Sequence, residues 1–149
     1  MIGEDVLKKM LSYTISFCVG IFFITYILNL PKHITGADEI VTEYYKEKYL
    51  TNVPLDCFFV LCYFIVAELF NYIFGLKSEY MKVLMVVLVT AALTGGFCYY
   101  FTTIPLNNDV FFSRWFNTVG YSSVVYDVIL LGFIYVIYLY MESYTNNET

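Results

Sequence analysis

The sequence predicts an all-α integral membrane protein folded as a four-helix bundle. Hydrophobic residues make up 60% of the 149 residues and charged residues only 14%, whereas about 25% of the residues in soluble domains are charged. Four mainly apolar stretches each have the length of about 20 residues that a helix needs to cross a bilayer. The aromatic share of 21% includes 16 tyrosines, whose rings can lie in lipid while their hydroxyls reach the interface.

We expect the membrane spans at residues 10–30, 55–76, 83–102 and 124–141, within one transmembrane domain that covers residues 1–149. A short polar turn separates the second and third spans, so these two should form an antiparallel hairpin. Four spans place both termini on one side of the membrane together with that turn. Lysines are denser on this side, which favours cytoplasmic termini.

The two longer loops are predicted to contain helices. Pro31 should end the first span. Residues 36–50 then place apolar side chains on one side and charged ones on the other, which predicts an amphipathic helix on the membrane face; a solvated connector helix is the alternative. In the second loop, residues 110–116 are too apolar for a solvated loop. They predict a short interfacial helix anchored by Trp115.

Two acidic residues of the spans lie on the same side of the membrane as the only arginine. Asp56 begins the second span, Asp127 lies about one turn into the fourth, and Arg114 lies in the loop before it. A carboxylate in a bilayer is costly unless it is paired, protonated or hydrated. Because a guanidinium presents several fixed donors, we expect Arg114 to pair with Asp56, Asp127 or both.

A third acid, Glu68, lies about 18 Å further along the second span, too far for Arg114 to reach. We expect Glu68 to be protonated and hydrogen-bonded to Asn71, a threonine or a tyrosine. Two interpretations stay open. The group is either a polar clasp between helices or a carboxylate that handles protons or cations.

Four consecutive residues, Thr118, Val119, Gly120 and Tyr121, match most of the potassium-channel filter sequence TVGYG. A filter needs consecutive carbonyls that face an axis shared by four subunits. Here Ser122 replaces the second glycine of the motif. A simple turn, in which Gly120 gives the backbone freedom to enter the last span, is the alternative.

The third span contains two pairs of small residues four positions apart, Ala91/Gly95 and Ala92/Gly96. Such pairs let helix backbones approach closely in membranes. We expect this face to pack either within the bundle or between copies, as a homo-oligomer.

The sequence lacks the residues and motifs that several functional classes require. His33 is the sole histidine and no cysteine pair, phosphate-binding loop or serine nucleophile motif is present, so we expect no metal site, no cofactor and no enzymatic activity. No basic cluster exists, which excludes nucleic acid as a partner and leaves membrane lipids.

The segment of residues 111–131 resembles the C-terminal part of uncharacterised four-span membrane proteins of large double-stranded DNA viruses. The matching positions are Phe111, Phe112, Arg114, Trp115, Phe116, Val119, Gly120, Tyr126 and Asp127. This resemblance implies a viral source and a viral or host intracellular membrane, and nothing about chemistry.

Three functions follow from these observations. The first is a non-enzymatic structural or assembly component of a viral or virus-modified membrane. The second is an ion channel or proton pathway that uses Glu68 and the turn at residues 118–121. The third is a lipid-handling protein whose polar site contains Asp56, Arg114 and Asp127, because an arginine beside carboxylates can recognise a head group.

Overall fold

The computed structural model describes residues 2–147, and the regular structure in this range is helical. Four long segments run the length of the molecule: α1 (Ile2–Ile21) with the π-helix η1 (Phe22–Ile27), α4 (Tyr49–Ile73), α5 (Glu79–Thr103) and α7 (Ser122–Asn147). All four are long and apolar enough to cross a membrane. The predicted four-helix membrane bundle is therefore confirmed.

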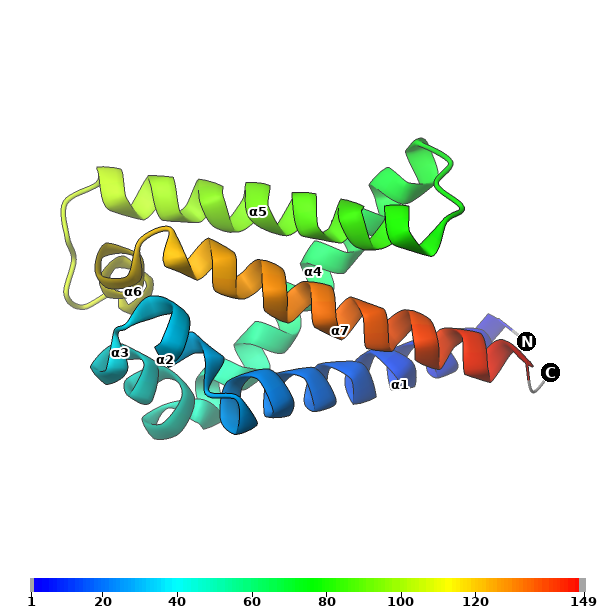
Figure 1. The fold of residues 1–149 in the computed structure, drawn as a ribbon, viewed down its shortest axis with the longest axis horizontal. Helices are drawn as coiled ribbons and strands as arrows, with labels where there is room; N and C mark the ends of the chain where they lie inside the picture. Colours follow the sequence, from blue (N-terminus) through cyan, green and yellow to red (C-terminus); the bar gives the residue numbers. More distant parts are fainter. Residues whose placement is uncertain (1, 148–149) are drawn as a thin grey trace.

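Three of the long helices form one packed row, with α7 between α1 and α5 (Figure 1). The fourth, α4, crosses the molecule diagonally and meets α5 at the hairpin turn. Both chain ends lie at the same end of the molecule as this turn, and the short helices lie at the opposite end, called here the loop end (Figure 1). Because α4 and α5 diverge from the turn, they form a V that opens toward the loop end.

The helices extend beyond the apolar stretches that predicted them. The second span starts at Tyr49 rather than near residue 55, and α4 includes Pro54 in its second turn. At that position the missing N–H of proline removes one hydrogen bond near the end of the helix. Hydropathy marks only the part of a helix that lies in the oil, so it underestimates helix length at polar ends.

The first span ends before Pro31, so the expectation that Pro31 ends it is wrong. The helix stops at Ile27, and Asn29 takes a left-handed conformation with φ +50°, which asparagine tolerates better than most residues. A new helix, α2 (Leu30–Thr35), then begins, with Pro31 in its first turn. Proline suits this position because the first helical N–H groups have no partner within the helix.

The amphipathic helix expected over residues 36–50 is divided into α3 (Asp38–Thr42) and the π-helix η2 (Glu43–Glu47). Its predicted apolar face is buried at Ile40, Val41, Tyr44 and Tyr45. Tyr49, which also falls within the predicted amphipathic segment, is exposed and belongs to α4. The apolar face packs onto the loop end of the bundle.

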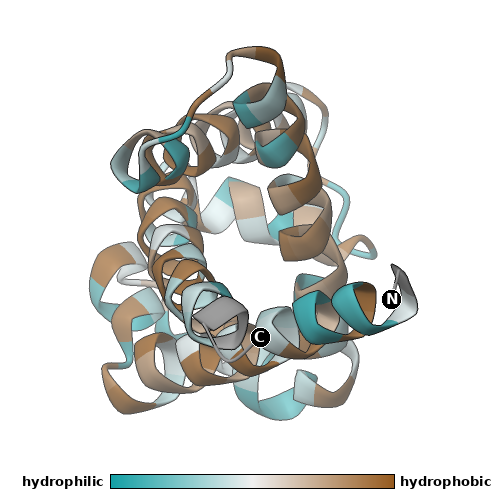
Figure 2. Ribbon diagram, turned by 90° about the vertical axis from the view of Figure 1, so that its right-hand side faces the viewer, coloured by the Kyte–Doolittle hydropathy of each residue, from teal (hydrophilic) through white to brown (hydrophobic). Residues whose placement is uncertain are grey.

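Large apolar side chains cover the outer surface of the long helices, as a bilayer environment requires. Examples from the four spans are Val19, Leu69, Leu88 and Val136, each at least 47% exposed. In the end view, hydrophilic residues lie on the first turns of α1, beside the N-terminal label, and on several other helix ends and turns (Figure 2). The distribution is that of a protein with an apolar middle and polar ends.

Candidate functional site

The short helix predicted before the last span is α6 (Phe111–Val119). Trp115 is buried rather than exposed at the interface, and its ring lies 5.2 Å from that of Tyr44. The ring of Phe111 lies 5.1 Å from the same tyrosine. Helix α6 therefore packs against η2, and these two elements together form what we call the loop-end cover.

The filter-like sequence forms a helix end and a turn. Thr118 and Val119 belong to α6, and Gly120 has φ +55° and ψ −142°, a conformation that is essentially restricted to glycine. The carbonyl oxygen of Val119 accepts a 2.5 Å hydrogen bond from Ser122 Oγ, and that of Gly120 accepts a 2.7 Å bond from Ser123 Oγ. These carbonyls are used within the chain, so the geometry is that of the turn and not of an ion filter.

Arg114 pairs with Glu43, and the expected pairing with Asp56 or Asp127 is wrong. Its two terminal nitrogens donate to the two carboxylate oxygens of Glu43 at 2.8 and 2.7 Å, the bidentate geometry that guanidinium groups favour. Lys48 Nζ also donates to Glu43, at 2.6 Å. The physical reason is location: Glu43 lies at the partly hydrated loop end, so the guanidinium keeps some contact with water, which Asp56 and Asp127 would not allow.

This ion pair shifts the pKa values of both of its members. The hydrogen bonds from Arg114 and then Lys48 lower the pKa of Glu43 from 4.5 to about 2. The bond to Glu43 raises the pKa of Arg114 above its ordinary value. The guanidinium also lies 5.4 Å from the centre of the Phe111 ring, close enough for a cation–π contact. The loop-end cover is thus held by one bidentate ion pair and several aromatic contacts.

Asp56 is hydrogen-bonded by Tyr44, the residue that follows Glu43. The hydroxyl of Tyr44 donates a hydrogen bond to Asp56 Oδ1, and Asn52 Nδ2 donates to the Tyr44 carbonyl at 3.2 Å. Burial, followed by the nearby Asp56 carboxylate, raises the pKa of Tyr44, so this hydroxyl stays a donor. The other oxygen of Asp56, Oδ2, is buried and has no hydrogen-bond partner among the described residues.

Asp127 is held by a chain of hydroxyl groups from two other helices. Thr94 Oγ1 donates to Asp127 Oδ2 at 2.9 Å, and the hydroxyl of Tyr63 lies 3.3 Å from the same Thr94 oxygen. Threonine has a single hydroxyl proton, so Tyr63 is the donor to Thr94 when Thr94 donates to Asp127. This chain links α4, α5 and α7.

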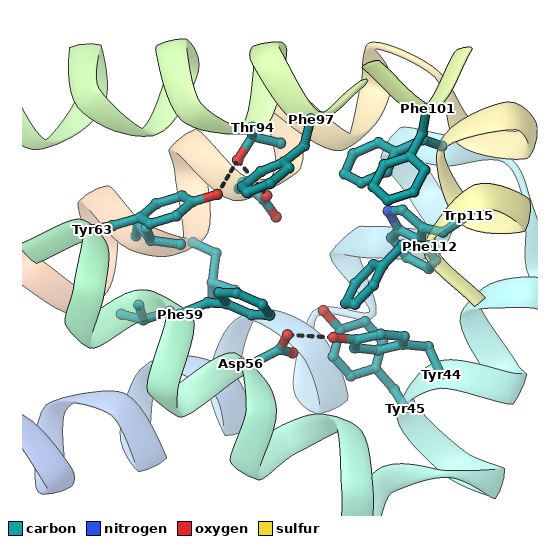
Figure 3. Close-up of a pocket in the computed structure, with 15 residues that line it drawn as sticks. Tyr44, Tyr45, Asp56, Phe59, Tyr63, Thr94, Phe97, Phe101, Phe112 and Trp115 are labelled. Carbon is teal, nitrogen blue, oxygen red and sulfur yellow. Dashed lines mark hydrogen bonds between the residues drawn. The ribbon is translucent and has the colours of Figure 1, made fainter. Parts of the chain in front are cut away.

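Asp56 and Asp127 line one cavity of about 210 Å³ between α4, α5, α7 and the loop-end cover (Figure 3). Most of its wall is aromatic. The lining residues are Tyr44, Tyr45, Asp56, Phe59, Val60, Tyr63, Thr94, Phe97, Phe101, Phe112, Trp115, Phe116, Asp127, Leu130 and Leu131. The cavity therefore combines two acids and four hydroxyl-bearing residues with a mostly apolar wall, which is the usual composition of a ligand site.

Glu68 forms a separate polar contact in the C-terminal third of α4, toward the hairpin turn. The hydroxyl of Tyr135, which is fully buried, donates to Glu68 Oε1 and accepts from Asn71 Nδ2 at 3.4 Å. The expected tyrosine partner is thus present, and Asn71 is linked to Glu68 through it. The contact joins α4 to α7, as the clasp interpretation requires, while proton handling stays a prediction.

The two glycines of the small-residue face of α5 have no close neighbour at the Cβ position among the described residues. A Cβ atom placed on Gly95 or Gly96 would meet nothing within 4 Å, so packing within the bundle is not found at these glycines, and contact between copies stays a prediction. The close helix contact lies elsewhere. A Cβ on Gly20 of α1 would lie 2.3 Å from Ile134 Cγ1 of α7.

Sequence reasoning missed the residues that complete the site. Glu43 carried a usable signal, because it lies on the polar side of an amphipathic segment at the same membrane face as Arg114. Phe59, Tyr63 and Phe97 carried none, since apolar side chains in a span give no indication of which helix face they occupy. In residues 2–147, no group of three or more histidine, cysteine or acidic side chains could hold a metal ion.

The fold and the cavity define a multi-pass helical membrane protein with an internal candidate binding site. Comparisons with protein-family models, with curated proteins and with solved structures give no match for this chain. The viral resemblance stays a prediction, and function is inferred from the site itself.

Proposed function

We propose that this protein is a non-enzymatic, lipid-handling membrane component that binds one amphiphilic molecule in the cavity between α4, α5 and α7. The observation that carries the proposal is the aromatic cavity of about 210 Å³ at the loop end. An apolar cavity of about 150 Å³ already accommodates benzene, so the space is sufficient for a small head group or the end of a lipid chain.

The position of the cavity supports an occupant that comes from the bilayer. Phe97 lines the cavity and is 42% exposed. The cavity lies between α4 and α5, two helices that are long and apolar enough to cross a membrane. Lipid would therefore lie beside the helices that form its wall. An amphiphile can place its polar end inside and leave its tail along the helices.

Photoreactive amphiphiles test this function. Three probes share one alkyl tail with a diazirine and differ in the head group, which is cationic, neutral or anionic. The full-length protein in lipid nanodiscs should be labelled saturably by at least one of them, at residues around Phe97 and Val60. Val60→Phe narrows the cavity because Val60 lines it, so labelling should fall several-fold.

Val19→Phe is the matched control, because Val19 is 47% exposed on the outer face of α1 and should not change labelling of the cavity. Uniform, non-saturable labelling of all outer helix faces, unaffected by Val60→Phe, contradicts ligand binding in the cavity.

The cellular setting is a second part of the proposal. The resemblance of residues 111–131 supports a viral or virus-modified membrane, and the lysine distribution supports cytoplasmic termini. Immunoblotting of purified particles and of infected-cell membranes tests the setting. Absence from both would contradict it.

An ion or proton pathway is a second candidate function, favoured by the link from Glu68 through Tyr135 to Asn71. Liposomes that contain the protein should then conduct protons or cations, and Glu68→Gln should reduce that flux. No flux from the wild-type protein, or flux equal in Glu68→Gln, removes this candidate.

A further inference from the structure

We propose that the occupant of the cavity is an organic cation with a methylated ammonium head group, held between Asp56, Asp127 and the faces of the surrounding aromatic rings. This inference rests on the proposed function, since it names the chemical class of the amphiphile that the same cavity would bind.

The first argument is a pair of acids that have no cationic partner in the cavity wall. Asp56 and Asp127 both line the cavity, and the described lining residues include no lysine, arginine or histidine. Two cations of the loop end, Arg114 and Lys48, both donate to Glu43, which does not line the cavity. A carboxylate removed from water is costly unless it is protonated, hydrated or paired with a cation. A cationic ligand would favour the ionised form of both acids and pair with them, whereas an anionic ligand would gain no such pairing.

The second argument is an unused acceptor. Tyr44 satisfies Oδ1 of Asp56, but Asp56 Oδ2 is buried without a hydrogen-bond partner among residues 2–147. Buried polar atoms of this kind are rare in folded proteins and need an explanation. A neutral apolar occupant would leave this oxygen without an electrostatic partner, whereas a methylated ammonium group placed against it would pair with it through charge, without a hydrogen bond.

The third argument is the aromatic wall, which selects the form of the cation. Figure 3 shows the rings of Phe59, Phe97, Phe112 and Trp115 around the cavity. Aromatic faces attract cations through the ring quadrupole, and such walls are used to recognise quaternary ammonium groups. A primary ammonium needs about three acceptors for its N–H groups, whereas a methylated ammonium needs none and fits a wall made mostly of rings.

Two sources of this head group are possible, a free cationic amphiphile or choline and a zwitterionic choline lipid. They share the trimethylammonium group, which would lie between the acids. A phosphate close behind that group would be repelled by the same two carboxylates unless it stayed outside the cavity, so the experiment includes both.

Trp115 provides the readout, because it is the only tryptophan of the chain and lines the cavity. Its emission is followed in the full-length protein in nanodiscs during titration with choline and with 3,3-dimethylbutan-1-ol, which has the same shape but no charge. We expect saturable binding of choline at least tenfold tighter than binding of the neutral alcohol. Dodecyltrimethylammonium, a dodecyl phosphocholine and dodecylamine then separate a free cation, a choline lipid and a primary amine.

Asp56→Asn and Asp127→Asn should each weaken choline binding at least tenfold. Glu68→Gln is the matched control, an acid of the same span that does not line the cavity, and should leave binding unchanged. If the aspartate variants do not fold, the affinities of the wild-type protein for choline and for 3,3-dimethylbutan-1-ol still test whether the cavity prefers a cation.

Each outcome counts for or against the inference. Equal affinity for the cation and the alcohol overturns it, and tighter binding of dodecylamine than of dodecyltrimethylammonium overturns the methylated form. Saturable labelling by the neutral or anionic probe without any preference for cations overturns this inference while the proposed function stands. No binding of any probe overturns both.

Discussion

The bidentate pair between Arg114 and Glu43 should be the main polar fastening of the loop-end cover. Its contribution can be estimated from the carboxylate. A pKa lowered from 4.5 to about 2 corresponds to at most about 3 kcal/mol at neutral pH, since each pKa unit is worth about 1.4 kcal/mol. The side chain of Glu43 is 20% exposed and the pair lies at a hydrated surface, so screening reduces this to about 1–2 kcal/mol.

Thermal unfolding of the protein in detergent tests this estimate. Glu43→Gln should lower the free energy of unfolding by about 1–2 kcal/mol at pH 7, equivalent to a few degrees in Tm. Because the folded pKa is the lower one, the stabilisation is complete above pH 4.5 and is lost as the pH falls toward about 2. The difference between wild type and variant should therefore shrink over this interval.

The exposed Glu39 of α3 supplies the matched control, and Glu39→Gln should leave Tm unchanged. Exchanging the charges in the double variant Glu43→Arg with Arg114→Glu should recover part of the stability that either single change removes. The reasoning is refuted if Glu43→Gln is as stable as wild type at pH 7, or if its deficit persists unchanged at pH 2–3.

Two pairs of glycine-to-alanine substitutions give further predictions. Gly20→Ala should destabilise the protein by about 1–3 kcal/mol, because the added Cβ would lie 2.3 Å from Cγ1 of the buried Ile134. Gly132→Ala adds only an ordinary 3.7 Å contact and should be tolerated. Equal Tm values for the two variants would contradict this prediction. Gly120→Ala should also cost about 1–3 kcal/mol, because its φ of +55° with ψ −142° disfavours a side chain, while Gly95→Ala, in open space on a helix, should be neutral or slightly stabilising. Circular dichroism during heating measures both pairs, and a Gly120→Ala variant as stable as Gly95→Ala would refute the turn argument.

The membrane bundle could be predicted because it depends on a property that is additive along the chain. Apolar stretches of sufficient length have to be helices that cross the bilayer, whatever their neighbours are. The ends of the helices were less predictable. The break at Asn29 and the π-helix at residues 43–47 depend on local backbone geometry, which hydropathy does not encode.

The site was predicted in part. Counting residues along the helices placed Asp56, Asp127 and Arg114 at the same end of the bundle, and the two aspartates do share a cavity. The predicted partner of Arg114 was wrong, because counting residues gives the depth of a side chain along the helix axis but not the direction in which it points around that axis. In η2, Glu43 accepts hydrogen bonds from Arg114, whereas the next residue, Tyr44, donates one to Asp56. Two residues that are adjacent in the sequence therefore bind different side chains.

The V formed by α4 and α5 also acts as a lever. Thr94 lies 15 positions beyond Glu79 at the start of α5, roughly 22 Å along the axis, so a change of about 5° in the angle between the helices displaces it by about 2 Å. The turn at the apex contains Gly75 with φ +61°. The volume of the cavity beside Thr94 therefore depends on the hairpin turn at the opposite face of the membrane. Substitutions in this turn should change the size of the ligand that the protein binds, although the turn does not contact the ligand.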